Sequence, residues 1–200
     1  APPAAAGAVW GPGGGRGEDG RGGGGGADAE AADEVEAGYG GLPRQAGGQV
    51  VVAGTSSGGG LALALLLRLR RLGEPPPAGV LALSPWTDLT CSGCSYESLA
   101  AHGPSREYLS FWGARYLDGA DPKAPEASPL FGDWRGVDVP MLLQCGGHEA
   151  MLDDSVLFAA RAVHCGCSVT LDVLREQQHG FQHEAAFNDA AAVAVERAAA

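Results

Sequence analysis

The sequence predicts an α/β protein with a doubly wound, mostly parallel sheet. Two observations lead to this prediction. From residue 49 onward, short apolar runs of strand length alternate with longer segments of helical periodicity. Each apolar run is continuous and does not alternate with polar residues, which is typical of parallel strands covered by helices on both faces.

The apolar runs and helical segments follow one another in a regular order. Val and Leu dominate the short runs, and Leu, Ala and basic residues make up the longest helical segment. The expected strands are residues 50–53, 79–83, 139–145 and 168–174, and the expected helices are residues 58–73, about 154–163 and about 183–200. Ligands of such sheets bind where loops follow the carboxyl ends of the strands, so candidate functional residues are sought there.

The first 45 residues have a different composition from the rest. Residues 11–26 are nearly all glycine and charged side chains, which offer little to a core. We therefore expect residues 1–45 to be a glycine-rich, poorly ordered segment. Residues 46–200 are expected to form one globular domain, because 45% of the 200 residues are hydrophobic, enough for a core.

Charge and cysteine content narrow the possible partners. A formal net charge of -11 opposes binding to nucleic acid or to an anionic membrane, since both favour basic surfaces. The longest apolar stretch, residues 61–67, is too short to span a bilayer, and the N-terminus lacks the pattern of a signal peptide, so we expect a cytoplasmic protein. The five cysteines are expected to be free thiols, and no metal or cofactor is expected.

Ser56 lies in the pentapeptide Gly54-Thr-Ser-Ser-Gly58, between an expected strand and an expected helix. A serine on such a sharp turn exposes its hydroxyl, and the strained turn requires very small residues two positions away on either side. The following helix start presents the backbone N–H of Ser57 to a developing oxyanion. The pentapeptide is less well interpreted as a phosphate-binding loop, because no Gly-Lys-Ser/Thr follows it in the sequence. We predict Ser56 as a nucleophile and Ser57 as an oxyanion donor.

A serine nucleophile needs a histidine base and a carboxylate on later strand-end loops. His179 follows the last expected strand after a polar loop, and the other four histidines are interpreted as surface or packing residues. Glu149 and Asp153 both follow the strand expected at 139–145. Either carboxylate could orient the histidine. We favour Glu149 because it is nearer the strand end, whereas Asp153 or the adjacent Asp154 could otherwise serve as the acid or could cap the next helix.

Together these residues resemble the hormone-sensitive-lipase-like branch of the α/β-hydrolases, the family IV carboxylesterases whose elbow reads Gly-Asp-Ser-Ala-Gly or Gly-Thr-Ser-Ala-Gly. The resemblance covers roughly residues 45–190. The segments that carry it are Gly54-Thr-Ser-Ser-Gly-Gly59, Arg68-Leu-Arg-Arg-Leu-Gly73, Leu83-Ser-Pro-Trp-Thr-Asp88, Ala127-Ser-Pro-Leu130, Gly146-Gly-His-Glu149, Leu152-Asp-Asp-Ser155 and His179-Gly-Phe181.

The resemblance implies the α/β-hydrolase fold and the hydrolysis of short- to medium-chain acyl esters, without a cofactor and often by a homodimer. By family position, Ser56 and His179 correspond to the nucleophile and the base. The threonine-containing subgroup keeps Asp153 as an alternative to Glu149 for the acid.

The family also has His-Gly-Gly-Gly after a strand, and its glycine N–H groups complete the oxyanion hole. The nearest counterpart here is Ala8-Val-Trp-Gly-Pro-Gly-Gly-Gly15, in which Pro12 replaces the histidine. By this match Gly13 and Gly14 are predicted oxyanion donors. Residues 16–45 are too short for the elements that the family places before the elbow, so the resemblance implies a fold incomplete on its N-terminal side.

The predicted function is a serine carboxylesterase that acts on a small-molecule ester through a Ser-His-acid triad. Two alternatives stay open, namely a catalytically impaired binding protein or fragment of the same fold, and an amidase or peptidase with the same triad. Four aromatic residues after the second expected strand could line an acyl pocket or pack in the core: Trp86, Tyr108, Phe111 and Trp112.

Overall fold

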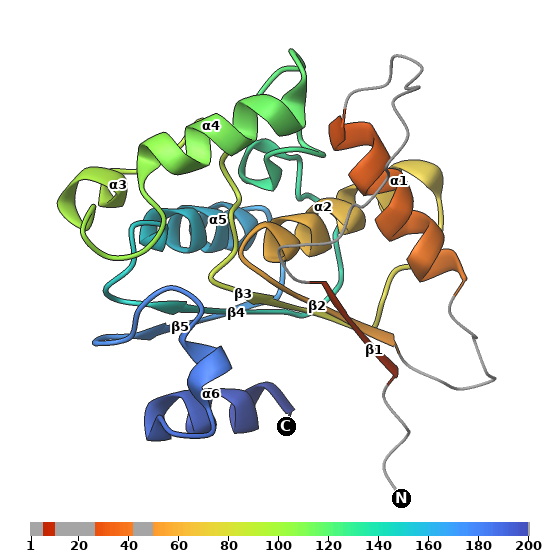
Figure 1. The fold of residues 1–200 in the computed structure, drawn as a ribbon. Helices are drawn as coiled ribbons and strands as arrows, with labels where there is room; N and C mark the ends of the chain where they lie inside the picture. Colours follow the sequence, from red (N-terminus) through yellow and green to blue (C-terminus); the bar gives the residue numbers. More distant parts are fainter. Residues whose placement is uncertain (1–5, 11–26, 42–49, 200) are drawn as a thin grey trace, which may run out of the picture.

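The computed structural model describes residues 6–10, 27–41 and 50–199, which form a parallel sheet with helices on both faces (Figure 1). The elements are β1 (Ala6–Trp10), α1 (Ala27–Gly40), β2 (Val50–Thr55), α2 (Ser57–Leu72), β3 (Gly79–Leu83), α3 (Ser95–Ser98), α4 (Arg106–Leu117), β4 (Met141–Gly146), α5 (Leu152–His164), β5 (Val169–Leu174) and α6 (Asp189–Ala199), with short 3₁₀ helices η1 (Pro129–Phe131) and η2 (Phe181–Glu184). The predicted strands and the first two predicted helices are thereby confirmed, and with them the α/β class, whereas the last helix begins at Asp189 and not near residue 183.

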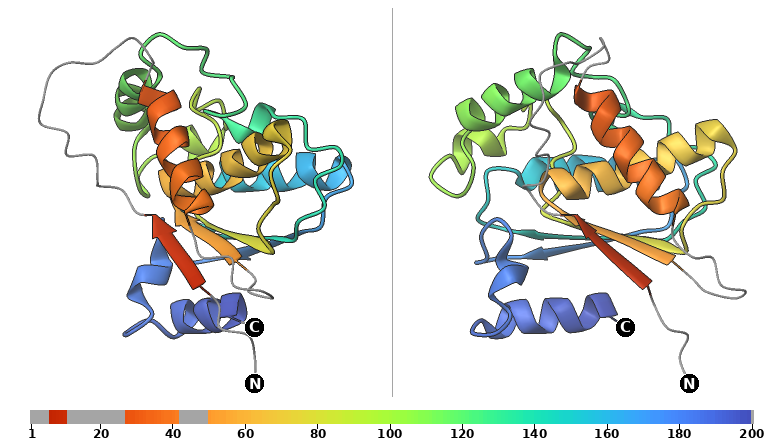
Figure 2. Two further views of the ribbon diagram at one scale, coloured as in Figure 1. Left: turned by 90° about the vertical axis from the view of Figure 1, so that its right-hand side faces the viewer. Right: turned by 45° about the vertical axis from the view of Figure 1, so that its right-hand side comes forward.

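The strands of the described sheet lie in the order β1-β2-β3-β4-β5, and each neighbouring pair is parallel. Helices α1 to α5 lie on one side of this sheet and α6 lies on the other (Figures 1 and 2). Thr55 is paired with Leu83, and Leu83 with Gln144, so the strands end at one edge. The loops after β2, β3, β4 and β5 therefore gather at that edge, as expected for a ligand site.

The main core lies between the sheet and the helices α2 and α5. Leu63 and Leu69 of α2 are almost fully buried, and the rings of Trp134 and Phe158 meet edge to face with centroids 4.8 Å apart. Helix α2 ends at Leu72 because Gly73 adopts a left-handed backbone with φ 70, and its N–H turns back to carbonyl groups of the last turn. Within the described ranges, no helix combines the length and the apolar character needed to cross a membrane.

Two elements, β1 and α1, lie within residues 1–45, which the sequence analysis expected to be poorly ordered. In α1, Val35 and Tyr39 are buried and stand four residues apart, so they share one helix face. The Tyr39 hydroxyl donates to the carbonyl of Pro75 at 3.0 Å. This short apolar face is enough to pack α1 on the core, although glycine dominates the composition around it.

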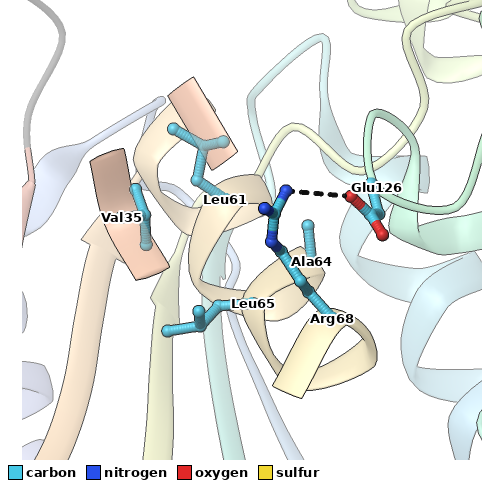
Figure 3. A pocket seen from close by; sticks show the side chains of 6 residues that line it. All are labelled: Val35, Leu61, Ala64, Leu65, Arg68 and Glu126. Carbon is cyan, nitrogen blue, oxygen red and sulfur yellow. Dashed lines mark hydrogen bonds and ion pairs between the residues drawn. The ribbon is translucent and has the colours of Figure 1, made fainter. Parts of the chain in front are cut away.

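Arg68 of α2 fixes α1 by charge as well as by packing. Its guanidinium pairs with Asp33 and Glu36 of α1. It also pairs with Glu126 at 3.2 Å (Figure 3). Val35 and the side chains of α2 leave a hollow of only about 10 Å³ beside this network (Figure 3). Such a space holds one water molecule at most. The polar cluster around Arg68 therefore attaches α1 to α2 and is not a ligand site.

Candidate active site

Ser56 forms the sharp turn between β2 and α2. Its backbone has φ 58 and ψ −121, a conformation that costs free energy in any residue other than glycine. Three backbone hydrogen bonds hold it there. Its N–H donates to Leu83 O at 2.9 Å, and its carbonyl accepts from Trp86 N at 2.9 Å and from Gly60 N at 3.1 Å.

The glycines around Ser56 are required by the close approach of backbone to backbone. A Cβ at Gly54 would lie 2.1 Å from the carbonyl oxygen of Gly58, and one at Gly60 would lie 2.1 Å from Trp86 O. No side chain fits at such distances. The close backbone contacts at Gly54 and Gly60 therefore explain why the turn requires very small residues beside it.

The first turn of α2 faces the same edge of the sheet as Ser56. Ser57 is the first residue of α2, and this first turn contains no acidic side chain that would oppose a negative charge at the helix start. Strand β1 ends at Trp10, which is paired with Gly54. The end of β1 thus lies beside the turn, and Gly13 and Gly14 lie outside the described residues.

Glu149 and His179 meet at the edge where the loops after β4 and β5 come together. The Nδ1 atom of His179 lies 3.2 Å from Oε2 of Glu149. The Glu149 carboxylate is fully buried, and the His179 side chain is 16% exposed. Oε1 of Glu149 has no hydrogen-bond partner among the described residues. The contact turns Nδ1 of the imidazole toward the carboxylate and Nε2 away from it.

Asp153 lies in the first turn of α5 and serves a different contact. Its Oδ2 accepts from the backbone N–H of Ser95 at 3.0 Å, and its own N–H donates to the Ser95 hydroxyl at 3.0 Å. These two bonds join the start of α5 to the start of α3. Of the two carboxylates considered from the sequence, the structure therefore places Glu149 at His179 and Asp153 at Ser95.

The remaining histidines do not join the Glu149 contact in the described residues. His102 and His148 stack with ring centroids 5.4 Å apart, while His164 ends α5 and His183 lies in η2. The backbone at Gly103 packs on His179, since a Cβ at that glycine would lie 3.2 Å from the His179 Cβ. The loop before α4 therefore supports the imidazole from the side.

Asp154 is a buried carboxylate that the sequence analysis considered only as an alternative acid or helix cap. Its oxygens accept from the backbone N–H groups of Thr87 and Asp88 at 2.8 and 2.9 Å and from the Tyr96 hydroxyl at 2.8 Å. Burial raises the pKa of Asp154 from 3.8 to about 7, although the three donors act in the opposite direction. It thus ties the loop after β3 to the start of α5.

The raised pKa of Asp154 has a defined effect on stability. Between pH 3.8 and about 7 the folded protein holds a proton on this carboxyl that the unfolded chain has released. The stabilising contribution is therefore complete below pH 3.8 and is lost as the pH rises through about 7. This group makes the folded state less stable at alkaline than at acidic pH.

A cavity of about 590 Å³ opens beside Ser56 and has mainly apolar walls. It is lined by Ser56, Ser57, Gly60, Leu61, Trp86, Leu89, Pro104, Tyr108, Leu109, Trp112, Tyr116 and Ala127. The sequence analysis named Trp86, Tyr108 and Trp112, whereas Phe111 is not among the lining residues and packs edge to face on Trp112. Helix α4 supplies Tyr116 as well, which sequence reasoning missed. Its place one turn beyond Trp112, on the same face of the helix, is a signal that could have found it.

The cysteines and acidic residues of the described ranges show no arrangement for a metal. All five cysteines are free. In the part of the chain that the structure describes, no group of three or more His, Cys, Asp or Glu side chains is placed to hold a metal ion.

Two curated proteins are similar to this chain over 66% of its length. The acetyl-hydrolase of Streptomyces hygroscopicus is 40% identical over 134 residues, which cover 66% of this chain and 44% of the relative. The esterase of Acinetobacter venetianus is 36% identical over 136 residues, covering 66% of this chain and 45% of the relative. The chain thus spans less than half the length of these two curated relatives.

A solved hormone-sensitive lipase from a metagenome library superimposes with a TM-score of 0.79 and 36% identity, covering 84% of this chain and 57% of that chain. A family model described as alpha/beta hydrolase fold matches residues 32–183, which is well over half of the sequence. By sequence and by structure, this chain belongs to the alpha/beta hydrolase fold family.

Proposed function

We propose that this chain is a serine carboxylesterase that cleaves neutral esters with short- to medium-length acyl groups. The observation that carries the proposal is the strained backbone of Ser56, φ 58 and ψ −121, at the wall of an apolar cavity of about 590 Å³. A strained residue persists where the surrounding structure fixes it, and such residues gather at active sites. The relatives named acetyl-hydrolase and esterase support the same class of reaction.

In the proposed reaction, His179 acts as the base and Ser56 as the nucleophile. Nε2 of His179 takes the proton from the Ser56 hydroxyl, and the oxygen attacks the ester carbonyl carbon. The tetrahedral intermediate collapses to an acyl-serine, and the alcohol leaves with the proton from His179. A water molecule, deprotonated by the same nitrogen, then attacks the acyl-serine. The carboxylic acid departs and the Ser56 hydroxyl regains its proton.

Glu149 is the proposed acid of the triad. Its carboxylate lies 3.2 Å from Nδ1 of His179, so it selects the tautomer with the proton on Nδ1 and stabilises the imidazolium that forms during the reaction. The proposed role of Asp153 is structural, because its carboxylate accepts from the Ser95 N–H. Complete burial of Glu149 strengthens its effect on the imidazole, since water does not screen the charge.

The proposed oxyanion donors are the backbone N–H of Ser57 and those of Gly13 and Gly14. Ser57 begins α2, where the helix dipole favours a negative charge. Gly13 and Gly14 follow Trp10 closely in the sequence, and the pairing of Trp10 with Gly54 supports a role for the two glycines. Each donor lowers the barrier for the tetrahedral intermediate, and the loss of one costs on the order of 10² to 10³ in rate.

Hydrolysis of p-nitrophenyl acetate and p-nitrophenyl butyrate by the 200-residue chain tests the proposal. We expect turnover that Ser56→Ala abolishes. Ser98→Ala serves as the matched control, because it removes a serine hydroxyl from the exposed end of α3. Turnover no greater than that of Ser56→Ala, in a protein that melts cooperatively, would instead indicate a hydrolase-fold binding protein. Faster cleavage of matching p-nitroanilides would indicate an amidase.

A further inference from the structure

The proposed base and nucleophile follow strands that are not neighbours in the sheet. Ser56 follows β2 and His179 follows β5, with β3 and β4 between them. Adjacent strands lie about 4.8 Å apart, so the two strand ends are separated by roughly 14 Å. The loop after β5 must therefore return across the ends of β4 and β3 before the imidazole can reach Ser56.

Two glycines allow the loop to cross the end of β4. A Cβ at Gly146 would lie 2.2 Å from the carbonyl oxygen of Gln177, and one at Gly147 would lie 2.5 Å from that of Arg175. The backbone N–H of His148 also donates to Gln177 O at 3.0 Å. The loop thus rests directly on the backbone that follows β4.

At the end of β3 the loop is held by one side chain, that of Ser84. The Ser84 hydroxyl oxygen accepts from the backbone N–H of Gly180 at 3.2 Å, and Gly180 directly follows His179. The N–H of Ser84 donates to Gln144 O at 2.7 Å, which fixes Ser84 to β4. Ser84 is fully buried, so water does not compete for this bond.

Ser84 keeps a hydroxyl where the backbone favours glycine. Its φ is 44, in the left-handed region where a side chain costs free energy. A glycine would avoid that cost but would leave the N–H of Gly180 without its partner. The local backbone strain is compatible with a functional demand for the hydroxyl at this position.

The same short segment also holds the nucleophile. Leu83 O accepts from the Ser56 N–H and the Trp86 N–H donates to the Ser56 carbonyl, both at 2.9 Å. Ser84 stands between these two residues. We propose, resting on the esterase function proposed above, that Ser84 is a positioning residue that sets the His179 imidazole against Ser56 through the backbone of Gly180.

The test compares Ser84→Ala and Ser84→Gly with the wild-type chain. Both variants remove the hydroxyl, but only Ser84→Gly also relieves the left-handed backbone, so their stabilities should differ while their activities fall together. A displacement of about 1 Å at a reacting group costs about 10²-fold in rate. We expect kcat for p-nitrophenyl acetate to fall about 10- to 100-fold in both, with KM within about twofold, because Ser84 does not line the cavity.

Ser155→Ala is the matched control, since Ser155 is a second fully buried serine, on α5 beside Cys145. It should keep the wild-type kcat even if its melting temperature falls. A Ser84→Gly or Ser84→Ala protein that folds and keeps kcat within threefold of wild type overturns the positioning role alone. So does a loss that lies in KM, or an equal loss of kcat in Ser155→Ala. A folded wild-type chain without Ser56-dependent turnover overturns the esterase proposal, and the role of Ser84 with it.

Discussion

Substitution of Gly54 by alanine should disable the site without unfolding the protein. The added Cβ would lie 2.1 Å from the carbonyl oxygen of Gly58, whereas Cβ contacts under 3.0 Å are essentially never seen. The start of α2 must therefore retreat by about 0.9 Å, which moves the Ser57 N–H away from the developing oxyanion. A misplacement of this size costs about 10²-fold in rate, and overpacking costs about 1–3 kcal/mol of stability.

Steady-state hydrolysis of p-nitrophenyl butyrate and urea unfolding measure the two effects separately. Gly73→Ala is the matched control at the other end of α2. It has φ 70 and no atom within 4 Å of its added Cβ, so it should lose about 1–2 kcal/mol from the left-handed backbone and keep its activity. If Gly54→Ala retained more than a third of wild-type kcat/KM, or if Gly73→Ala lost as much activity, the argument from the tight turn would be refuted.

Four further substitutions probe the acid, the buried carboxylate and the cavity. Glu149→Gln should lower kcat for p-nitrophenyl acetate by about 10³- to 10⁴-fold because the wrong tautomer of His179 is stabilised, whereas Asp153→Asn should cost less than tenfold; the reverse order would exchange their roles. Asp154→Asn should remove the decrease in unfolding free energy that the wild type shows between pH 5 and pH 8, since the pKa of Asp154 is raised to about 7. Urea unfolding at several pH values measures this, and an unfolding free energy that falls with pH as steeply as in the wild type would contradict it. Trp112→Ala, at a half-exposed wall of the cavity, should lower kcat/KM for butyrate about 10-fold, mainly through KM, and a loss confined to kcat would count against its place in the acyl site.

Sequence patterns were sufficient for the strands that carry the site because each is a mostly apolar run. Strands β3 and β4 are largely buried, and β5 is partly exposed. The continuous apolar run at Gly79–Leu83 has the bounds of β3, and the runs around it define β2, β4 and β5 within a few residues. Continuous apolar character is what burial between two helical layers demands. The positions of Ser56 and His179 at strand ends follow from these runs alone.

Other parts of the site depend on contacts that composition does not reveal. Glu149 and Asp153 stand four residues apart after the same strand. They differ in their contacts, since Glu149 lies at His179 and Asp153 at Ser95, which is far away in sequence. Helix α1 was missed because Val35 and Tyr39 are few apolar residues beside many glycines, and because Arg68 of α2 supplies the rest of its attachment. In each case a long-range side-chain contact decides the outcome.

The central claim is that Ser56 is a nucleophile activated by His179. Treatment of the folded chain with a fluorophosphonate, followed by intact-mass measurement and peptide mapping, tests it most directly. We expect one adduct per chain, located on Ser56, absent in Ser56→Ala and formed at least 100-fold more slowly in His179→Ala. A folded protein that gains no adduct, or one that is labelled at another residue, would contradict it.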